Sequence, residues 1–208
     1  MKVLIFGASG GTGRFLVQEG LASGYLVTAF VRNPLSITIE NKSLVVLKGD
    51  VLNPKDVENA MDGVDVVISA LGNKTSNALW KSNTIISDGV KNIVSAMRKK
   101  EVKRLLFIAS FGVNENIFLP EKFFIRTVLK NLFADIPLQE KQIKESGLDW
   151  TIVHPARLVN TTKTGIYKMA EDLPIGLFSK IARADVADFL IKNIKTDSLI
   201  GKTVTVSY

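Results

Sequence analysis

Three glycines near the start of the chain have the spacing Gly7-x-x-Gly10-x-x-Gly13. They follow a short apolar run directly and open a segment with apolar residues at helical spacing. In such a unit the glycines allow a tight turn, a close approach of backbone to phosphate, and close packing of helix on strand. The spacing therefore predicts a pyrophosphate site formed by the turn and its hydroxyl residues: Gly7, Ser9, Gly10, Gly11, Thr12 and Gly13. A plain glycine-rich turn between strand and helix is the alternative.

An arginine, Arg32, stands where the second predicted strand ends. A site for NAD(H) usually has an aspartate or glutamate at this place, which binds the ribose 2′-hydroxyl. Residues 29–34 contain no acid, whereas a guanidinium forms charge-assisted hydrogen bonds with a 2′-phosphate. The sequence thus favours NADP(H) over NAD(H) as cofactor, with a solvated surface arginine as the alternative.

The tyrosines do not form the Tyr-x-x-x-Lys pair with which most short-chain dehydrogenases protonate the oxyanion left by hydride transfer to a carbonyl. Four residues beyond Tyr25 is Ala29, four beyond Tyr167 is Glu171, and Tyr208 ends the sequence. Ordinary ketone–alcohol chemistry is therefore disfavoured.

Cysteine is absent and His154 is the single histidine. Disulfides, thiolate metal sites, cysteine nucleophiles and multi-histidine metal sites are thereby excluded, and we expect no metal. His154 stands at the end of a predicted strand before Pro155, where a structural role is the expectation. Ser110 is not part of a nucleophile elbow, because Ile108 replaces the leading glycine of that motif.

The formal net charge is +7, from 27 basic and 20 acidic residues. Only residues 98–104 gather basic side chains, at the end of a predicted helix where cations favour the helix dipole. Aromatic residues do not alternate with these bases, so nucleic-acid binding is not expected. No apolar stretch is long enough to span a bilayer, and the start of the chain does not resemble a signal peptide. We expect no membrane contact and a cytoplasmic location.

Strands and helices alternate along the whole sequence. The apolar runs predict strands at residues 3–6, 26–31, 44–47, 64–69, 104–109 and 150–153, with a possible short strand at 164–169 and a final edge strand at 202–207. Helices are predicted at residues 11–23, 53–61, 79–100, 121–146 (broken near Pro137) and 184–194. Strands apolar on both faces are typical of buried parallel sheets. The pattern predicts a single-domain α/β fold over residues 1–208, a doubly wound, mainly parallel Rossmann sheet flanked by helices.

These features, together with Gly49-Asp50-Val51 and the segment 146–153, resemble the atypical short-chain dehydrogenase/reductases. The likeness is greatest to the NADPH-dependent flavin reductase/biliverdin-IXβ reductase group and runs over almost the whole chain. It implies that the Gly7 turn holds the pyrophosphate, that Arg32 holds the 2′-phosphate, and that a small substrate-side region lies at about residues 155–182. It also implies cofactor contacts after the third to sixth strands: Asp50 and Val51 at the adenine; Ala70, Leu71, Gly72 and Lys74; Ser110 beside the nicotinamide; and the covering loop of Pro155, Ala156, Arg157 and Leu158.

The sequence also departs from this group. Ser36 stands near where the biliverdin reductase carries a second arginine, and Arg157 stands where it has a histidine. Residues 116–133 do not align well, and the stretch 118–133 predicts a helix that covers the sheet, with a substrate lid or a dimer face as the alternative. The resemblance therefore supports the prediction of the cofactor more strongly than a prediction of the substrate.

The chemistry that remains is hydride transfer from NADPH to a flat conjugated acceptor such as a flavin, a quinone or a tetrapyrrole. Such a ring delocalises the arriving charge itself, so the enzyme needs a rigidly held cofactor under an open apolar pocket. Ser110 would position the nicotinamide or the acceptor as the catalytic residue, or merely cap the turn after the fifth strand. Two alternatives stay open: a non-catalytic NADP(H) sensor of the NmrA-like type, and an epimerase- or dehydratase-like enzyme with His154 as its acid/base. We expect a monomer or homodimer whose partner is a small-molecule acceptor.

Overall fold

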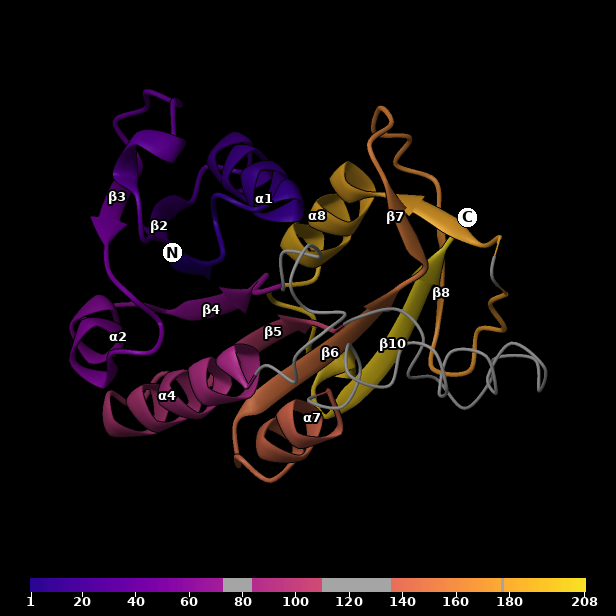
Figure 1. Cartoon of the computed structure of the whole chain (residues 1–208). Coiled ribbons are helices and arrows are strands. Elements are labelled where there is room, and N and C mark those ends of the chain that lie inside the picture. The colour runs from indigo at the N-terminus through magenta and orange to yellow at the C-terminus, as the bar shows by residue number, and fades with distance from the viewer. Residues whose placement is uncertain (73–83, 110–135, 177) are drawn as a thin grey trace.

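The computed structural model describes residues 1–72, 84–109, 136–176 and 178–208. Its centre is an eight-stranded sheet (Figure 1). All neighbouring strands in it are parallel except the last pair, which is antiparallel. The order across the sheet is β3 (Leu44–Lys48), β2 (Leu26–Val31), β1 (Lys2–Phe6), β4 (Val66–Ser69), β5 (Arg104–Ile108), β6 (Asp149–Pro155), β10 (Lys202–Ser207) and β8 (Lys168–Ala170). The expected doubly wound, mainly parallel sheet is confirmed.

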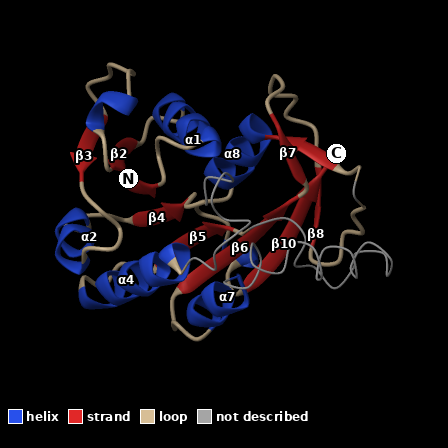
Figure 2. Ribbon diagram, in the orientation of Figure 1, coloured by secondary structure: helices blue, strands red, loops and turns tan. Residues whose placement is uncertain are grey.

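Helices cover both faces of the sheet (Figure 2). One face carries α1 (Gly11–Ala22) and α8 (Arg183–Lys192), and the other carries α2 (Pro54–Ala60), α4 (Ile85–Lys99) and α7 (Ile136–Lys144). Two short 3₁₀ turns, η1 (Pro34–Ser36) and η2 (Asp197–Leu199), complete the helical elements of the described ranges. The described residues therefore form a single three-layer domain.

The central strand β1 shows why the chain takes this form. Val3 and Ile5 belong to the core beneath α1 and α8, whereas Leu4 and Phe6 belong to the core on the opposite face. All four side chains are fully buried. A strand that is apolar at every position can bury both of its faces only between two layers of helices. The two cores account for the alternation of helices between the faces.

The sheet reverses its winding between β1 and β4. From β1 the chain goes outward to β2 and β3, then returns across β1 to β4 and continues to β5 and β6. In open α/β sheets the crevice for a ligand lies at this switch point, outside the carboxyl ends of the strands. The loops that follow β1, β2, β3 and β4 all reach that edge, and these loops carry most of the residues expected to bind a cofactor.

The region after β6 differs from expectation. Pro155 ends β6, while Arg157 and Leu158 belong to β7 (Arg157–Val159), which pairs in parallel with β9 (Lys180–Ala182) in a second small sheet. The expected loop over residues 155–158 is therefore wrong as a description of the backbone. The short strand expected at 164–169 is β8, which lies later, at Lys168–Ala170. Residues 164 and 165 instead form a turn around the carboxylate of Asp185.

The last strand was expected at the edge of the sheet, and this is also wrong. β10 lies between β6 and β8, because β8 pairs with it antiparallel and takes the edge position. Of the helical region expected over 121–146, the described part is α7. Pro137 is the second described residue of α7. Past the end of α7, Gly147 adopts the left-handed conformation, with φ of 69°.

Candidate dinucleotide-binding site

The glycine-rich turn after β1 has the geometry that its spacing predicts. Gly7 has φ of 74°, and a Cβ on it would lie 2.5 Å from the carbonyl oxygen of Ala70. The N–H of Gly10 donates to the carbonyl of Gly7 at 2.9 Å and closes the turn. A Cβ on Gly13 would overlap the backbone of Gly7 and Ala8. A side chain at either Gly7 or Gly13 would therefore push the turn apart.

The first turn of α1 is free to bind an anion from the carboxyl edge. Gly10 is the N-cap residue in an extended conformation, and no side chain caps the helix. The first turn contains no acidic residue. Ser9, Gly10 and Gly11 are exposed, whereas Thr12 and Gly13 are buried against the sheet. Backbone N–H groups and the positive end of the helix dipole thus point to the crevice, where they suit a pyrophosphate.

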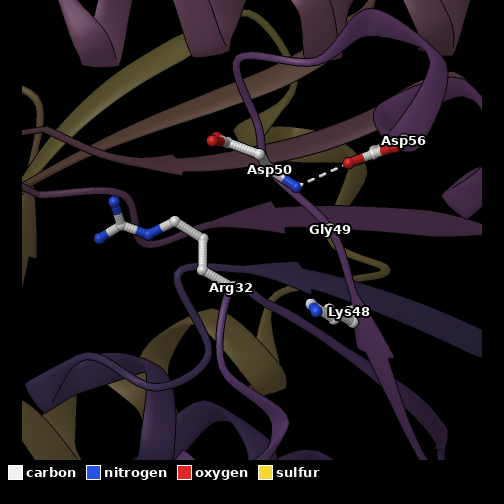
Figure 3. A pocket seen from close by; sticks show the side chains of 5 residues that line it. All are labelled: Arg32, Lys48, Gly49, Asp50 and Asp56. Atoms are coloured by element: carbon white, nitrogen blue, oxygen red, sulfur yellow. Dashed lines mark hydrogen bonds between the residues drawn. The ribbon is translucent and has the colours of Figure 1, made fainter.

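A cavity of about 380 Å³ lies beyond the ends of β2 and β3 (Figure 3). It is lined by Arg32, Lys48, Gly49, Asp50 and Asp56. In Figure 3 the side chains of Arg32 and Asp50 extend to the same side of the loop. Neither Arg32 nor Lys48 forms an ion pair with any of the residues that the structure describes. The carboxylates of Asp50 and Asp56 in the same lining accept hydrogen bonds from the loop, so the two exposed cations are the charged groups available to a phosphate.

The acidic residues of this cavity hold the loop together. Asp56 accepts from the backbone N–H of Asp50 at 2.9 Å and from the Asn53 amide at 3.1 Å. Asp50 accepts from the backbone N–H of Leu52 at 3.0 Å. A Cβ on Gly49 would overlap the ring of Phe30, so only glycine fits there. These contacts fix the loop after β3 that carries Asp50 and Val51, the pair expected at the adenine.

The expected adenine pair is supported by α4. Asp50 is exposed, while Val51 is 9% exposed and its carbonyl accepts from Asn92 of α4 at 2.9 Å. Gly89, also on α4, faces this pair: a Cβ on it would lie 3.1 Å from the methyl groups of Val51 and 3.3 Å from Leu71. A glycine inside a helix usually has a packing reason. Gly89 lets α4 approach the loops after β3 and β4 closely, and it escaped the sequence analysis although its place in a helical segment was a signal.

The loop after β4 starts beside the glycine turn. The N–H of Ala70 donates to the carbonyl of Phe6 at 2.9 Å, so Ala70 lies directly against the end of β1. Leu71 is half-buried against the core beneath α4, and Gly72 is exposed with open space around it. The structure brings these three residues to the same edge as the turn. Lys74, Ser110 and the segment 116–133 lie outside the described residues, so their roles stay predictions.

His154 is engaged by the protein itself. It is 4% exposed, and its Nε2 lies 2.7 Å from Oε1 of Glu140 on α7. Lys144 donates to the other oxygen of Glu140 at 2.8 Å. Burial acts to raise the pKa of Glu140, but the hydrogen bonds and charges of His154 and Lys144 outweigh it and hold the pKa below its ordinary value. This buried group ties α7 to β6, as a structural role for His154 predicts.

The segment expected to cover the nicotinamide is built into the sheets. Pro155 and Ala156 are buried, and the N–H of Ala156 donates to the carbonyl of Val206 at 2.9 Å. Arg157 is exposed and its backbone N–H donates to the carbonyl of Ser179 at 3.1 Å, while Leu158 is half-buried. The segment thus leaves β6 at the carboxyl edge, and Arg157 presents its side chain to solvent.

The basic residues at the end of α4 make internal contacts. Arg98 donates to the carbonyls of Glu145 and Ser146, and Lys99 and Lys100 pair with Glu58 and Asp62. Arg104 donates to three backbone carbonyls and to the hydroxyl of Thr151. The described ranges contain no cluster of residues that could hold a metal ion. They also contain no helix with the length and apolarity needed to cross a bilayer.

Comparison with known proteins defines the class. Residues 7–197 match the NAD(P)H-binding family, so the chain belongs to this family of Rossmann-fold proteins and binds a nicotinamide dinucleotide. It is 31% identical over 197 residues to an uncharacterized chloroplastic protein of Arabidopsis thaliana, covering 89% of this chain and 70% of that protein.

Two further similar proteins carry the names of enzymes. The chain is 27% identical over 230 residues to the chloroplastic divinyl chlorophyllide a 8-vinyl-reductase of Arabidopsis thaliana. The alignment covers 99% of this chain but only 53% of that enzyme. A solved structure from Bacillus halodurans, named as an NAD-dependent epimerase/dehydratase, superposes with a TM-score of 0.85 and 25% identity, over 100% of this chain and 94% of that one. The expected membership of the atypical short-chain dehydrogenase/reductases is confirmed.

Proposed function

We propose that this protein is an NADPH-dependent reductase that transfers hydride to a flat conjugated acceptor, such as a flavin, a quinone or a tetrapyrrole. The observation that carries the choice of cofactor is the cavity with Arg32 and Lys48 at the ends of β2 and β3. A ribose 2′-phosphate bears nearly two negative charges, and these two exposed cations would neutralise them. An acid that would bind a free 2′-hydroxyl is absent from residues 29–34.

The tyrosines support an acceptor that needs no protein acid. Tyr167 donates to Asp188 at 2.8 Å, and Tyr208 donates to Asp185 at 2.5 Å. Burial, followed by Asp188, raises the pKa of Tyr167 above its ordinary value. Tyr25 precedes β2 at the opposite edge of the sheet from the glycine turn. A ketone reductase needs a tyrosine poised to release its proton beside the nicotinamide, whereas a conjugated ring takes its proton from solvent after the hydride arrives.

The relatives support the acceptor class without defining the acceptor. One relative, from Arabidopsis thaliana, is named as a vinyl-reductase of a chlorophyllide. The bound nicotinamide would supply the hydride, and the chain would hold it: the Gly7 turn at the pyrophosphate, Arg32 at the 2′-phosphate, and Asp50 with Val51 at the adenine. Ser110 and the segment 155–158 would lie at the nicotinamide end, beside the substrate-side region of residues 155–182.

The test is steady-state oxidation of NADPH with FMN, riboflavin, a quinone and biliverdin as separate acceptors. We expect turnover above the rate without enzyme for at least one of them, and a higher kcat/KM with NADPH than with NADH. A Gly13→Val variant is the matched control, because its side chain would overlap the turn and should abolish turnover. If none of the acceptors gives turnover above the background rate, the proposal is refuted.

A non-catalytic NADP(H) sensor of the NmrA-like type is the second candidate, favoured by the same lack of a tyrosine–lysine pair. It predicts NADPH binding with no turnover of any acceptor, so the same experiment separates the two. An epimerase-like reaction is less favoured, because His154, its only candidate acid/base, is buried against Glu140. Gel filtration and cell fractionation would test the expected monomer or homodimer and the expected cytoplasmic location.

A further inference from the structure

Two helices begin side by side at the carboxyl edge of the sheet. α1 follows β1, and α8 leads back through η2 to β10, which runs parallel to β6 and so in the same sense as β1. The start of α8 therefore lies at the same edge as the start of α1. The two helices pack along one another on the same face (Figure 1). Arg183, the first residue of α8, is thus brought beside the glycine turn from far away in the sequence.

Arg183 lies across Gly11, the first residue of α1. A Cβ on Gly11 would lie 2.7 Å from Nε and 3.0 Å from Cδ of Arg183. The guanidinium group therefore occupies the space into which a side chain at position 11 would project. The missing side chain of Gly11 is what allows an arginine to reach the turn at this point. Neither the spacing of the glycines nor the sequence around Arg183 indicated this contact.

The charge of Arg183 has no acidic partner among the residues that the structure describes. Its Nη1 donates to the neutral side-chain amide of Asn160 at 2.8 Å, which orients the guanidinium. The nearest acid along α8 is Asp185, whose carboxylate is fully buried and accepts from Thr164, Gly165 and Tyr208. A half-buried arginine with a neutral partner keeps donors and a full charge for an anion.

We propose that Arg183 binds the pyrophosphate of the dinucleotide, from the side of α8, while the N–H groups of α1 bind it from the other side. This proposal rests on cofactor binding at the Gly7 turn. It gives the two arginines different tasks: Arg32 contacts a group that only NADP(H) carries, whereas Arg183 contacts a group common to NADP(H) and NAD(H). Guanidinium groups suit this task because their planar donors match two phosphate oxygens at once.

The test compares dissociation constants of wild type, Arg183→Ala and Arg32→Ala for three probes: NADPH, NADH and adenosine 2′-monophosphate, which has no pyrophosphate. Arg183→Ala should weaken NADPH and NADH by the same factor, about 10-fold to 100-fold for loss of charged hydrogen bonds, and leave the monophosphate unchanged. Arg32→Ala should weaken NADPH and the monophosphate but spare NADH. Lys195→Ala, which removes the same charge beyond the far end of α8, should change none of the three.

A double-mutant cycle tests the place of the guanidinium. Gly11→Ala should displace Arg183 and weaken both dinucleotides, but should cost little more in the Arg183→Ala background, where the space is free. Melting temperatures of all variants would show that they fold. Unchanged dinucleotide affinity in Arg183→Ala, or a raised KM for the acceptor alone, would overturn the proposal, the latter assigning the arginine to the acceptor. Binding with no turnover would instead refute the reductase and leave this inference standing.

Discussion

Replacement of Arg32 by alanine should change cofactor preference rather than cofactor binding as a whole. Arg32 and Lys48 are the two cations of the cavity beyond β2 and β3, and both are exposed. The 2′-phosphate is the one group by which NADPH differs from NADH. Removal of Arg32 should therefore weaken NADPH strongly and NADH by less than about twofold.

The size of the effect follows from the exposure of these side chains. A hydrogen bond to a charged group contributes about 1.5–3 kcal/mol, and solvent screening places an exposed arginine at the lower end of that range. Arg32→Ala should thus weaken NADPH roughly 10-fold to 30-fold. Lys48 offers a single point charge, so Lys48→Ala should cost only about twofold to fivefold.

Titration of each variant with NADPH and NADH at low and at physiological ionic strength would measure these changes. The NADPH preference of the wild type should shrink as salt rises, because both cations are exposed. Lys42→Ala is the matched control, since it removes an exposed lysine just before β3, at the opposite edge of the sheet from Lys48. Equal losses for NADPH and NADH in Arg32→Ala would refute the reasoning.

Three further predictions concern packing and charge. Asp185→Ala should lower the free energy of unfolding, measured by urea titration, by about 3 kcal/mol. The reason is that loss of this fully buried carboxylate leaves the donors of Thr164, Gly165 and Tyr208 unpaired. A loss below about 1 kcal/mol would contradict this. Glu140→Gln should flatten the loss of stability in acid: the folded pKa of Glu140 lies below its ordinary 4.5, so its contribution is present above that value and is lost as pH falls toward the folded pKa. If the free energy of unfolding falls with pH equally steeply in the variant and in wild type, another group controls the loss of stability in acid. Gly89→Leu should weaken the binding of NADPH and NADH alike, because the new side chain would displace Val51 and Leu71. Wild-type affinity of this variant in isothermal titration would show that close packing at Gly89 does not matter for cofactor binding.

Features set by neighbouring residues could be predicted from the sequence. The helix α2 begins where Asn53 and Pro54 predict it, because the side chain of Asn53 accepts from the N–H of Lys55 at 3.1 Å and proline suits the first helical position. The turn after β1 takes its form from Gly7 and Gly13, whose places admit no side chain. The cap and Gly13 depend on contacts within a few residues, which local spacing records, whereas the room at Gly7 is limited by the distant Ala70.

Features set by distant pairing could not be predicted in the same way. The position of β10 inside the sheet depends on β8 pairing with it, and the pairing of β7 with β9 joins segments more than twenty residues apart. Lys48 and Arg183 were missed for the same reason: Lys48 lines the cavity because β3 lies beside β2, and Arg183 reaches Gly11 because α8 lies beside α1. Ser36, expected from the resemblance to lie near the place of the biliverdin reductase's second arginine, donates to the carbonyl of Asn33 at 2.6 Å.

Three cations at the carboxyl edge of the sheet are available to the phosphates of a dinucleotide. The chain carries a formal charge of +7, yet the lysines at the end of α4 and along α8 are paired with carboxylates. Arg32, Lys48 and Arg183 have no such partner among the described residues, and all three lie where strands end or helices begin at the carboxyl edge. Charges of one sign repel each other, so such a group costs free energy unless an anion joins it. A dinucleotide would bring its pyrophosphate to Arg183 and its 2′-phosphate to Arg32 and Lys48, whereas the carboxylates of Asp50 and Asp56 in the same cavity already accept hydrogen bonds from the loop.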